Sequence, residues 1–177
     1  MIRYSIEPPE SDPAIEALLD RSFGPARHLK TAQRLRDGRL PAEGLSFVAS
    51  EGDAILGTLR FWHLSAGDGT DALLLGPVAV EPALVGQGIG RELIRIGLAE
   101  AARQNYPAVL LVGDPGYYGR FGFAPHRTRS LTLPGPFERH RLLGLELAPN
   151  ALTGARGLIR PTGVIDPVWP KKRRKAA

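Results

Sequence analysis

The sequence predicts an α/β domain built on a mixed sheet, and two observations lead to this prediction. First, residues 45–50 and 54–64 are strand-like and flank a Glu-Gly-Asp turn, which predicts an antiparallel hairpin. Second, an apolar run at 73–80 is followed by a glycine-rich loop, a helical stretch and another apolar run at 108–112. Strand, helix and strand in this order form a right-handed crossover between parallel strands. Antiparallel and parallel pairs together make a mixed sheet.

The N-terminal part of the chain predicts one strand and two helices. Residues 2–6 have the composition of a short strand. Asp12 is a favourable N-cap and Pro13 suits the first helical position, so a helix is predicted over residues 12–23. A second, weaker helix is predicted over residues 27–37, and Gly-Pro pairs and single glycines separate these elements.

The second predicted helix is basic, because it carries Arg27, Lys30, Arg34 and Arg36. A run of cations on a weak helix most often forms a solvated face, and we prefer this interpretation. The alternative is a surface beside an acidic substrate or beside a coenzyme phosphate.

Three glycines lie between the central apolar run and the long helix that is predicted to follow it. Gly86, Gly88 and Gly90 alternate with larger residues just before that helix. The first N–H groups of a helix have no partner within it and carry a partial positive charge, so glycines there can form a phosphate cradle. A Walker loop is excluded because Arg91 follows Gly90 where a lysine is needed. A dinucleotide fingerprint is disfavoured by the spacing, and a simple tight turn remains the alternative.

The central strand, residues 73–80, is interrupted by Gly76-Pro77. Proline cannot donate a ladder hydrogen bond, and glycine within a strand suggests a bulge. A break there would separate the central strand from its parallel neighbour and leave backbone groups unpaired in the gap. An extended, amide-bearing chain could pair with those groups as an additional strand.

Two motifs resemble signatures of the GNAT family of N-acetyltransferases. The loop from Val85 to Gly90 is similar to the acetyl-coenzyme A signature Arg/Gln-x-x-Gly-x-Gly/Ala, although Val85 replaces the usual Arg or Gln. The segment Tyr-Tyr-Gly-Arg-Phe-Gly-Phe at 117–123 is similar to the second signature, with Tyr118 at the tyrosine position. The resemblance covers roughly residues 2–147 and is strongest to a bacterial branch with a Gly-Asp-Pro-x-Tyr-Tyr-x-Arg-Phe-Gly-Phe segment.

This resemblance implies a three-layer α/β fold with a mixed, partly splayed central sheet. It implies direct transfer of an acetyl group from acetyl-coenzyme A to a primary amine, with Tyr118 as the general acid that protonates the departing thiolate. Residues assigned to acetyl-coenzyme A are Val78, Ala79, Val80, Gly86, Gln87, Gly88, Ile89, Gly90, Arg91, Asp114 and Tyr118. No metal is implied. The general base is open between Glu81, His63 and a chain of water molecules.

The bulk composition limits the remaining possibilities. The net charge of +5 lies in the run from Lys171 to Lys175, because the other 18 Lys and Arg equal the 18 Asp and Glu. We therefore divide the chain into a GNAT domain at 1–147, a packed irregular extension at 148–170 and a basic disordered tail at 171–177. The sequence has no cysteine and no apolar run long enough to span a membrane, which fits a cytoplasmic protein.

Several functional questions remain open at the level of sequence. The alternatives to catalysis are a non-catalytic acetyl-coenzyme A binder and an RNA-binding protein that uses the basic tail, although nucleic acid is an unlikely partner because residues 1–170 are formally neutral. A dinucleotide-dependent oxidoreductase is disfavoured by the glycine spacing. A polyamine, an amino acid, an aminoglycoside and a protein N-terminus are all possible acceptors, and the family resemblance makes a homodimer possible.

Overall fold

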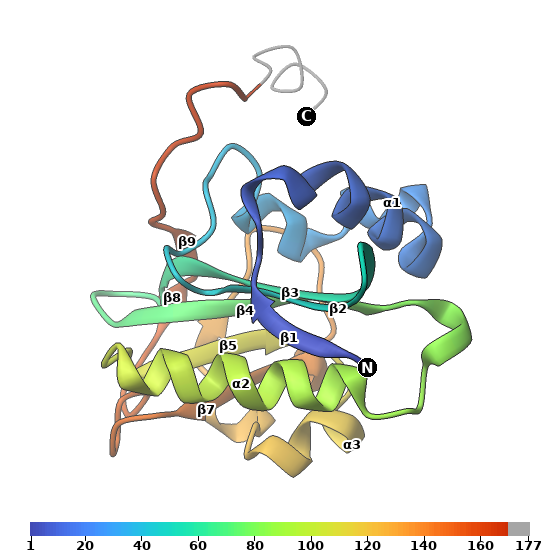
Figure 1. Cartoon of the computed structure of the whole chain (residues 1–177). Coiled ribbons are helices and arrows are strands. Elements are labelled where there is room, and N and C mark those ends of the chain that lie inside the picture. The colour runs from blue at the N-terminus through green and yellow to red at the C-terminus, as the bar shows by residue number, and fades with distance from the viewer. Residues whose placement is uncertain (170–177) are drawn as a thin grey trace.

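A computed structural model describes residues 1–169 and has a seven-stranded sheet at its centre (Figure 1). The strand order is β1-β2-β3-β4-β5-β7, and β9 pairs with β3 beside this path. All pairs are antiparallel except β4 with β5, which are parallel, so the predicted mixed sheet is confirmed. The strands are β1 (Arg3–Ile6), β2 (Ser46–Glu51), β3 (Ala54–Ser65), β4 (Asp71–Val80), β5 (Ala108–Val112), β7 (Leu142–Glu146) and β9 (Arg160–Pro161).

Helices cover both faces of this sheet, which confirms the three-layer arrangement (Figure 1). Helix α1 (Asp12–Phe23) lies on one face, while α2 (Ile89–Arg103) and the short α3 (Pro115–Tyr118) lie on the other. Two further strands, β6 (Leu131–Thr132) and β8 (Gly157–Leu158), pair with each other outside the main sheet. Single 3₁₀ turns occupy Pro9–Ser11, Pro25–Leu29, Thr31–Leu35, Pro82–Leu84, Gly119–Phe121, Pro125–Thr128 and Arg139–Arg141.

The core consists of apolar side chains on both faces of β3 and β4. On the α2 face, Leu59 and Phe61 are fully buried against Leu93 and Ile94 of the helix. Full burial of such a side chain stabilises the fold by about 1.5–3 kcal/mol. Gly97 lets α2 approach the sheet closely, since a Cβ there would lie 2.6 Å from the Phe61 ring. The position of α2, and of the loop before it, is therefore fixed by the core.

The central strand separates from its parallel neighbour as the sequence predicts. Strands β4 and β5 pair only at Leu73–Val109 and Leu74–Leu110. Beyond that point Gly76 and Pro77 together oppose one residue of β3, so the β3–β4 register shifts there. Gly76 has φ +129°, a conformation that favours glycine, and the Trp62 indole N–H donates to the Gly76 carbonyl at 2.6 Å. The parallel pairing therefore ends at this bulge, which the hydrogen bond from Trp62 holds in place.

Two details of the predicted secondary structure are wrong. The helix predicted over 27–37 is two 3₁₀ turns, because Lys30 between them is extended with φ −65° and ψ 142°. Alternation along residues 54–64 predicts that Ile55 shares a face with Leu59 and Phe61, but Ile55 packs against α1 on the opposite face. A register shift between β2 and β3 next to Ile55 explains the difference, because one extra residue reverses the alternation of side chains.

The C-terminal part is tied to the sheet by residues that the sequence pattern did not mark as strands. Ile159 is buried between β8 and β9, and Leu152 is buried nearby. The domain boundaries drawn at 147 and 170 stay predictions, and the basic tail at 171–177 lies outside the described residues. Within residues 1–169, no helix has the length and apolar character needed to cross a membrane.

Candidate active site

The glycine-rich loop and the start of α2 form one side of a cavity of about 600 Å³. Gly88 is the N-cap of α2 with φ +87°, and no side chain caps the helix. The N–H groups of Ile89, Gly90 and Arg91 belong to the first turn, where an α-helix offers no internal acceptor. These donors, the positive end of the helix dipole and the Arg91 side chain make this cavity suitable for an anion. We call it the coenzyme cradle.

The cradle is lined by all the predicted coenzyme residues except one. Val78, Ala79, Val80, Gly86, Gln87, Gly88, Ile89, Gly90, Arg91 and Tyr118 all border it. Asp114 instead borders the neighbouring cavity, and its carboxylate accepts a 3.0 Å hydrogen bond from the Gly116 N–H as the cap of α3. A role for Asp114 at the coenzyme is therefore not favoured by this geometry. Whether the other residues bind a coenzyme stays a prediction.

A larger cavity of about 840 Å³ lies on the other side of the bulge in β4. Gly76 and Pro77 of the bulge border it, as does Gly113 at the end of β5. Val78 and Tyr118 border both cavities. The two cavities therefore meet at the gap between β4 and β5. We call the larger one the acceptor cavity.

Tyr118 stands where the two cavities meet. Its ring packs tightly on Gly113, since a Cβ there would lie 2.5 Å from Cε2, and its centroid is 6.1 Å from that of Phe123. Burial, with a smaller contribution from Tyr117, raises the pKa of Tyr118 to about 12, while the positive charge of Arg141 opposes this rise. The hydroxyl therefore keeps its proton throughout the physiological range and can serve as a donor.

Comparisons with known proteins agree with these observations. Residues 42–125 match the acetyltransferase (GNAT) domain. The chain is similar to the uncharacterized N-acetyltransferase YhbS of Escherichia coli K12, with 34% identity over 87% of this chain and 92% of the relative. A crystal structure of Escherichia coli YhbS in complex with CoA has a TM-score of 0.76 at 32% identity, covering 91% of this chain and 89% of that one.

A second solved structure is a GNAT family acetyltransferase from Brucella melitensis in complex with acetyl-CoA. It has a TM-score of 0.62 at 26% identity and covers 94% of both chains. The chain belongs to the GNAT acetyltransferase family. Its predicted family and enzyme class, an N-acetyltransferase, are thereby confirmed.

In this GNAT acetyltransferase, the two side chains considered as the general base, His63 and Glu81, border neither of these two cavities. His63 lies near the C-terminal end of β3, and its ring centroid is 5.7 Å from that of Tyr106. Glu81 accepts a 2.9 Å hydrogen bond from Arg21, and residues of neither cavity include it. This geometry therefore favours neither side chain as the base, and the route of the proton stays a prediction.

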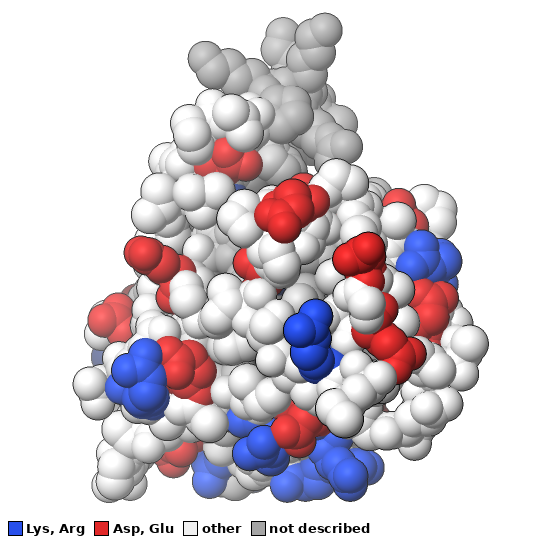
Figure 2. Space-filling view, in the orientation of Figure 1, with Lys and Arg blue, Asp and Glu red and all other residues white. Residues whose placement is uncertain are grey.

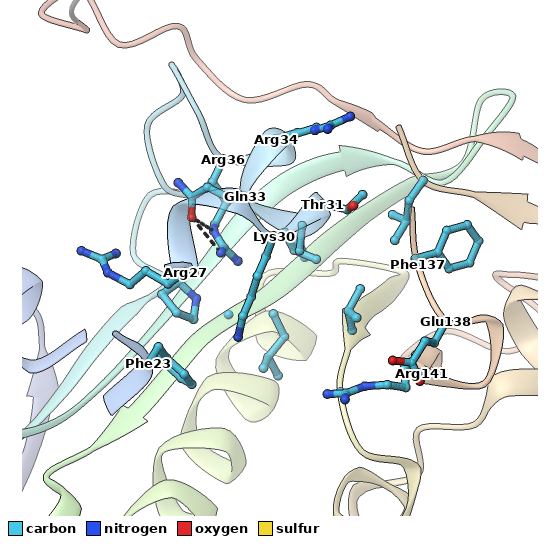
Figure 3. Close-up of a pocket in the computed structure, with 18 of the residues that line it drawn as sticks. Phe23, Arg27, Lys30, Thr31, Gln33, Arg34, Arg36, Phe137, Glu138 and Arg141 are labelled. Atoms are coloured by element: carbon cyan, nitrogen blue, oxygen red, sulfur yellow. Dashed lines mark hydrogen bonds between the residues drawn. The ribbon is translucent and has the colours of Figure 1, made fainter. Parts of the chain in front are cut away.

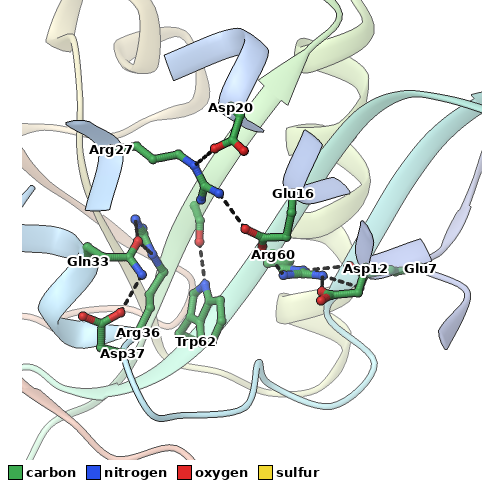
Figure 4. A network of polar contacts seen from close by, with 11 residues as sticks. Glu7, Asp12, Glu16, Asp20, Arg27, Gln33, Arg36, Asp37, Arg60 and Trp62 are labelled. Atoms are coloured by element: carbon green, nitrogen blue, oxygen red, sulfur yellow. Dashed lines mark hydrogen bonds and ion pairs between the residues drawn. The ribbon is translucent and has the colours of Figure 1, made fainter. Parts of the chain in front are cut away.

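The basic segment of this GNAT acetyltransferase forms two 3₁₀ turns and no helix, and Lys30 and Arg34 in it are exposed to solvent as the sequence suggested. Arg27, Lys30, Arg34 and Arg36 all border the acceptor cavity. A network of polar contacts holds the segment in place (Figure 4). In it, Arg27 pairs with Glu16 and Asp20 of α1 at 2.5 and 2.9 Å. The alternative interpretation of the basic segment, a surface beside an acidic substrate, is compatible with its position at this cavity.

Other lining residues carried no sequence signal that we recognised. Phe23 at the end of α1 borders both cavities, and Phe137 and Arg141 border the acceptor cavity. Tyr117 borders the cradle, and its hydroxyl would lie 3.7 Å from a Cβ on Gly90. Of these four residues, only Tyr117 could have been assigned to the site from a sequence motif, because it adjoins Tyr118. The others come from segments that meet only in the folded chain.

Proposed function

We propose that this GNAT acetyltransferase transfers the acetyl group of acetyl-CoA directly to a primary amine, with Tyr118 as the general acid. One observation carries the proposal. An anion-binding cradle and a separate cavity meet at a gap in the sheet, and Tyr118 stands at the junction. The cofactor bound to the two solved relatives, CoA in one and acetyl-CoA in the other, supports the cradle as the coenzyme site.

The proposed arrangement assigns each part of the coenzyme to a part of the site. Its pyrophosphate lies against the backbone N–H groups at the start of α2, and Gly86 and Gly88 keep side chains away. Its amide-bearing arm enters the gap beside Val78, where β4 has lost its parallel partner. The thioester then reaches the junction with the acceptor cavity.

The chemistry requires one bond to form and one to break. The neutral amine nitrogen attacks the thioester carbon, the carbonyl oxygen becomes negative, and the C–S bond then breaks. Backbone donors in the gap would stabilise the oxyanion. Tyr118, neutral because of its raised pKa, donates to the sulfur as the thiolate forms.

Water molecules in the open acceptor cavity would accept the proton that the amine nitrogen loses, and a proton from water would then restore the Tyr118 hydroxyl. Cationic side chains around that cavity disfavour a further positive charge on a bound ligand, so they lower the pKa of a bound ammonium group. A dedicated carboxylate base is then unnecessary. This fits the positions of His63 and Glu81 outside both cavities.

The proposal is tested by coenzyme binding and by thiol release. Acetyl-CoA should raise the melting temperature of the protein while NAD does not, since only a ligand of the native state stabilises it. Free thiol should then accumulate when a suitable amine is added. Coenzyme binding with no thiol release for any amine would favour a non-catalytic acetyl-CoA binder instead.

A further inference from the structure

The walls of the acceptor cavity come from two irregular segments. One wall is the pair of 3₁₀ turns from Pro25 to Leu35, and the other is the stretch 133–138 with Arg141. The Thr31 hydroxyl donates to the Pro136 carbonyl, and Arg34 Nη1 donates to the Pro134 carbonyl at 2.6 Å. These two hydrogen bonds join the two segments on one side of the cavity. The space is therefore shaped for a small molecule.

Four cations border this cavity with no carboxylate of the described residues within ion-pair distance, although Asp37 attracts the Arg36 guanidinium from farther away. Lys30 and Arg141 extend into it from opposite walls (Figure 3), and Lys30 Nζ lies 4.9 Å from the Phe23 ring centroid. The Arg36 guanidinium donates only to the neutral amide oxygen of Gln33, at 2.9 and 3.3 Å. Arg34 donates only to a backbone carbonyl. Arg27 differs, because Glu16 and Asp20 neutralise it.

The two carboxylates that border the cavity offset these four positive charges only in part. Asp114 is used as the cap of α3. Glu138 is two-thirds exposed, and its nearest partner is His140 at 3.5 Å. Burial lowers the pKa of Arg36 to about 10, so this guanidinium is still cationic at neutral pH and costs desolvation free energy. A ligand anion would compensate that cost.

The excess of charge is local to the cavity. Residues 1–170 contain equal numbers of basic and acidic side chains. On the face shown in Figure 2, red and blue side chains are mixed, and the blue ones gather along the lower edge. A general excess of positive charge over the domain therefore does not explain four unpaired cations around one cavity.

We propose that the acceptor is a small amine that also carries an oxyanion, either a carboxylate or a phosphate. This inference rests on the proposed acetyl transfer, because it assigns the acceptor to the cavity beyond Tyr118. Guanidinium groups bind both kinds of oxyanion through paired, charge-assisted hydrogen bonds. Lys30, Arg36 and Arg141 hold the anion, and the amine at the other end of the molecule faces the thioester.

This assignment divides the possible acceptors. Amino acids and aminoalkyl phosphates carry the required anion. Polyamines and aminoglycosides carry several ammonium groups and no anion, so the cavity repels them. The same cations also promote loss of the proton from the bound amine.

The test is a panel of matched acceptors with the full chain, saturating acetyl-CoA and thiol release as the readout. ω-Amino carboxylates of rising length are each compared with the alkylamine of the same length, and phosphoethanolamine is compared with ethanolamine. We expect the best amine with an oxyanion to exceed the matched amine without one roughly 10- to 100-fold in kcat/KM, the scale of one charged hydrogen bond. The carboxylate and phosphate arms identify which oxyanion is preferred, and spermidine should be a poor acceptor.

Two variants link that preference to the cavity. Lys30→Gln and Arg36→Gln should each lower kcat/KM for the oxyanion-bearing amine roughly 10-fold or more through KM, and lower it less for the matched amine without the oxyanion, so that the ratio of the two falls. Lys30 is exposed, so its substitution should not affect folding. Arg103→Gln is the control, because it removes the same charge from an exposed residue at the end of α2.

The outcomes separate a failure of this inference from a failure of the proposed acetyl transfer. Neutral amines that are acetylated as well as their anionic partners would overturn the inference and leave the acetyl transfer intact. Equal effects of Lys30→Gln and Arg103→Gln would also overturn it, since the preference would then not arise in this cavity. If acetyl-CoA binds by calorimetry and no amine releases thiol, the proposed transfer itself fails, and the inference fails with it.

Discussion

The coenzyme cradle is made largely of backbone from one continuous stretch, the end of β4, the glycine loop and the first turn of α2. The acceptor cavity is made of side chains from segments that lie about a hundred residues apart, as in the pairs Thr31–Pro136 and Arg34–Pro134. A backbone site depends on local conformation and tolerates few residues at its glycines. A side-chain site changes its charge with single substitutions. Specificity can therefore vary in the cavity while the cradle stays the same.

The largest expected effect comes from filling the cradle. Gly88→Glu introduces a side chain at φ +87° and a carboxylate against the N–H groups that would hold the phosphates. The new carboxylate can itself cap α2, so it competes with the coenzyme as well as repelling it. We expect acetyl-CoA affinity to fall at least about 100-fold, the scale of two lost charged hydrogen bonds, as measured by calorimetry.

Gly69→Glu is a matched control for this substitution. Gly69 has φ +90°, lies in a turn and has open space around its Cα, so backbone strain and added charge are similar to those at Gly88. It borders neither cavity. Unchanged acetyl-CoA affinity in a folded Gly88→Glu protein would contradict the cradle. Equal losses in both variants would attribute the effect to strain.

The next effect tests the junction of the two regions. Tyr118→Phe removes one oxygen and keeps the ring packed on Gly113 and Phe123. If the hydroxyl donates to the thiolate, kcat should fall about 100-fold while KM for acetyl-CoA changes little. Because the pKa of Tyr118 is raised to about 12, the neutral donor persists up to that pH. The kcat profile of the unmodified protein should therefore show no loss from this group below about pH 11.

Tyr117→Phe separates the cradle from the junction. The Tyr117 hydroxyl lies beside Gly90 in the cradle, so its loss should weaken acetyl-CoA binding a few-fold and leave kcat unchanged. A Tyr118→Phe protein with normal kcat would remove the general acid from the mechanism. A collapse of kcat in Tyr117→Phe would instead assign the acid to the neighbouring tyrosine.

A smaller effect tests how far the cradle depends on the core. Gly97→Val would place side-chain atoms where the rings of the core already lie, since even a Cβ would be 2.6 Å from Phe61. Overpacking of this kind should lower the free energy of unfolding by about 1–3 kcal/mol in a denaturant titration. Acetyl-CoA affinity should fall a few-fold because α2 shifts, whereas the preference for anionic acceptors should not change. Arg95→Val, on the exposed side of the same helix, is the control.

The contrast between the regions also explains what the sequence could predict. The cradle was predictable because three alternating glycines before a helix have a direct conformational meaning, and the splay was predictable because Pro77 cannot donate a hydrogen bond. Both are local effects of individual residues. The β2–β3 hairpin and the parallel pairing of β4 with β5 were predicted from local connections in the same way, whereas the places of β1 and β7 in the sheet were not.

The acceptor cavity was not predictable for the opposite reason. Residues 27–37 have helical residue types, but Leu35 is their one fully buried side chain, and Thr31 and Arg34 bond to carbonyls about a hundred positions away. Packing of a weak segment against a distant one decided its conformation, and propensity did not. The bulge that moved Ile55 to the other face also left no clear mark in the alternation of side chains.

The smallest expected effect concerns the basic tail, and it decides whether the preference for anions is local. A chain ending at Pro170 lacks the five positive charges of Lys171 to Lys175. All residues that border the two cavities lie between Ser22 and Arg141. At about 0.15 M salt the screening length is about 8 Å, so the five charges would influence a bound acceptor only from close by. We therefore expect the melting temperature and kcat to be nearly unchanged, and the ratio of kcat/KM for anionic and neutral amines to change less than about twofold. If shortening the chain abolished this ratio and Lys30→Gln did not, long-range attraction to the tail would be its source, and the cavity would have no part in choosing the acceptor.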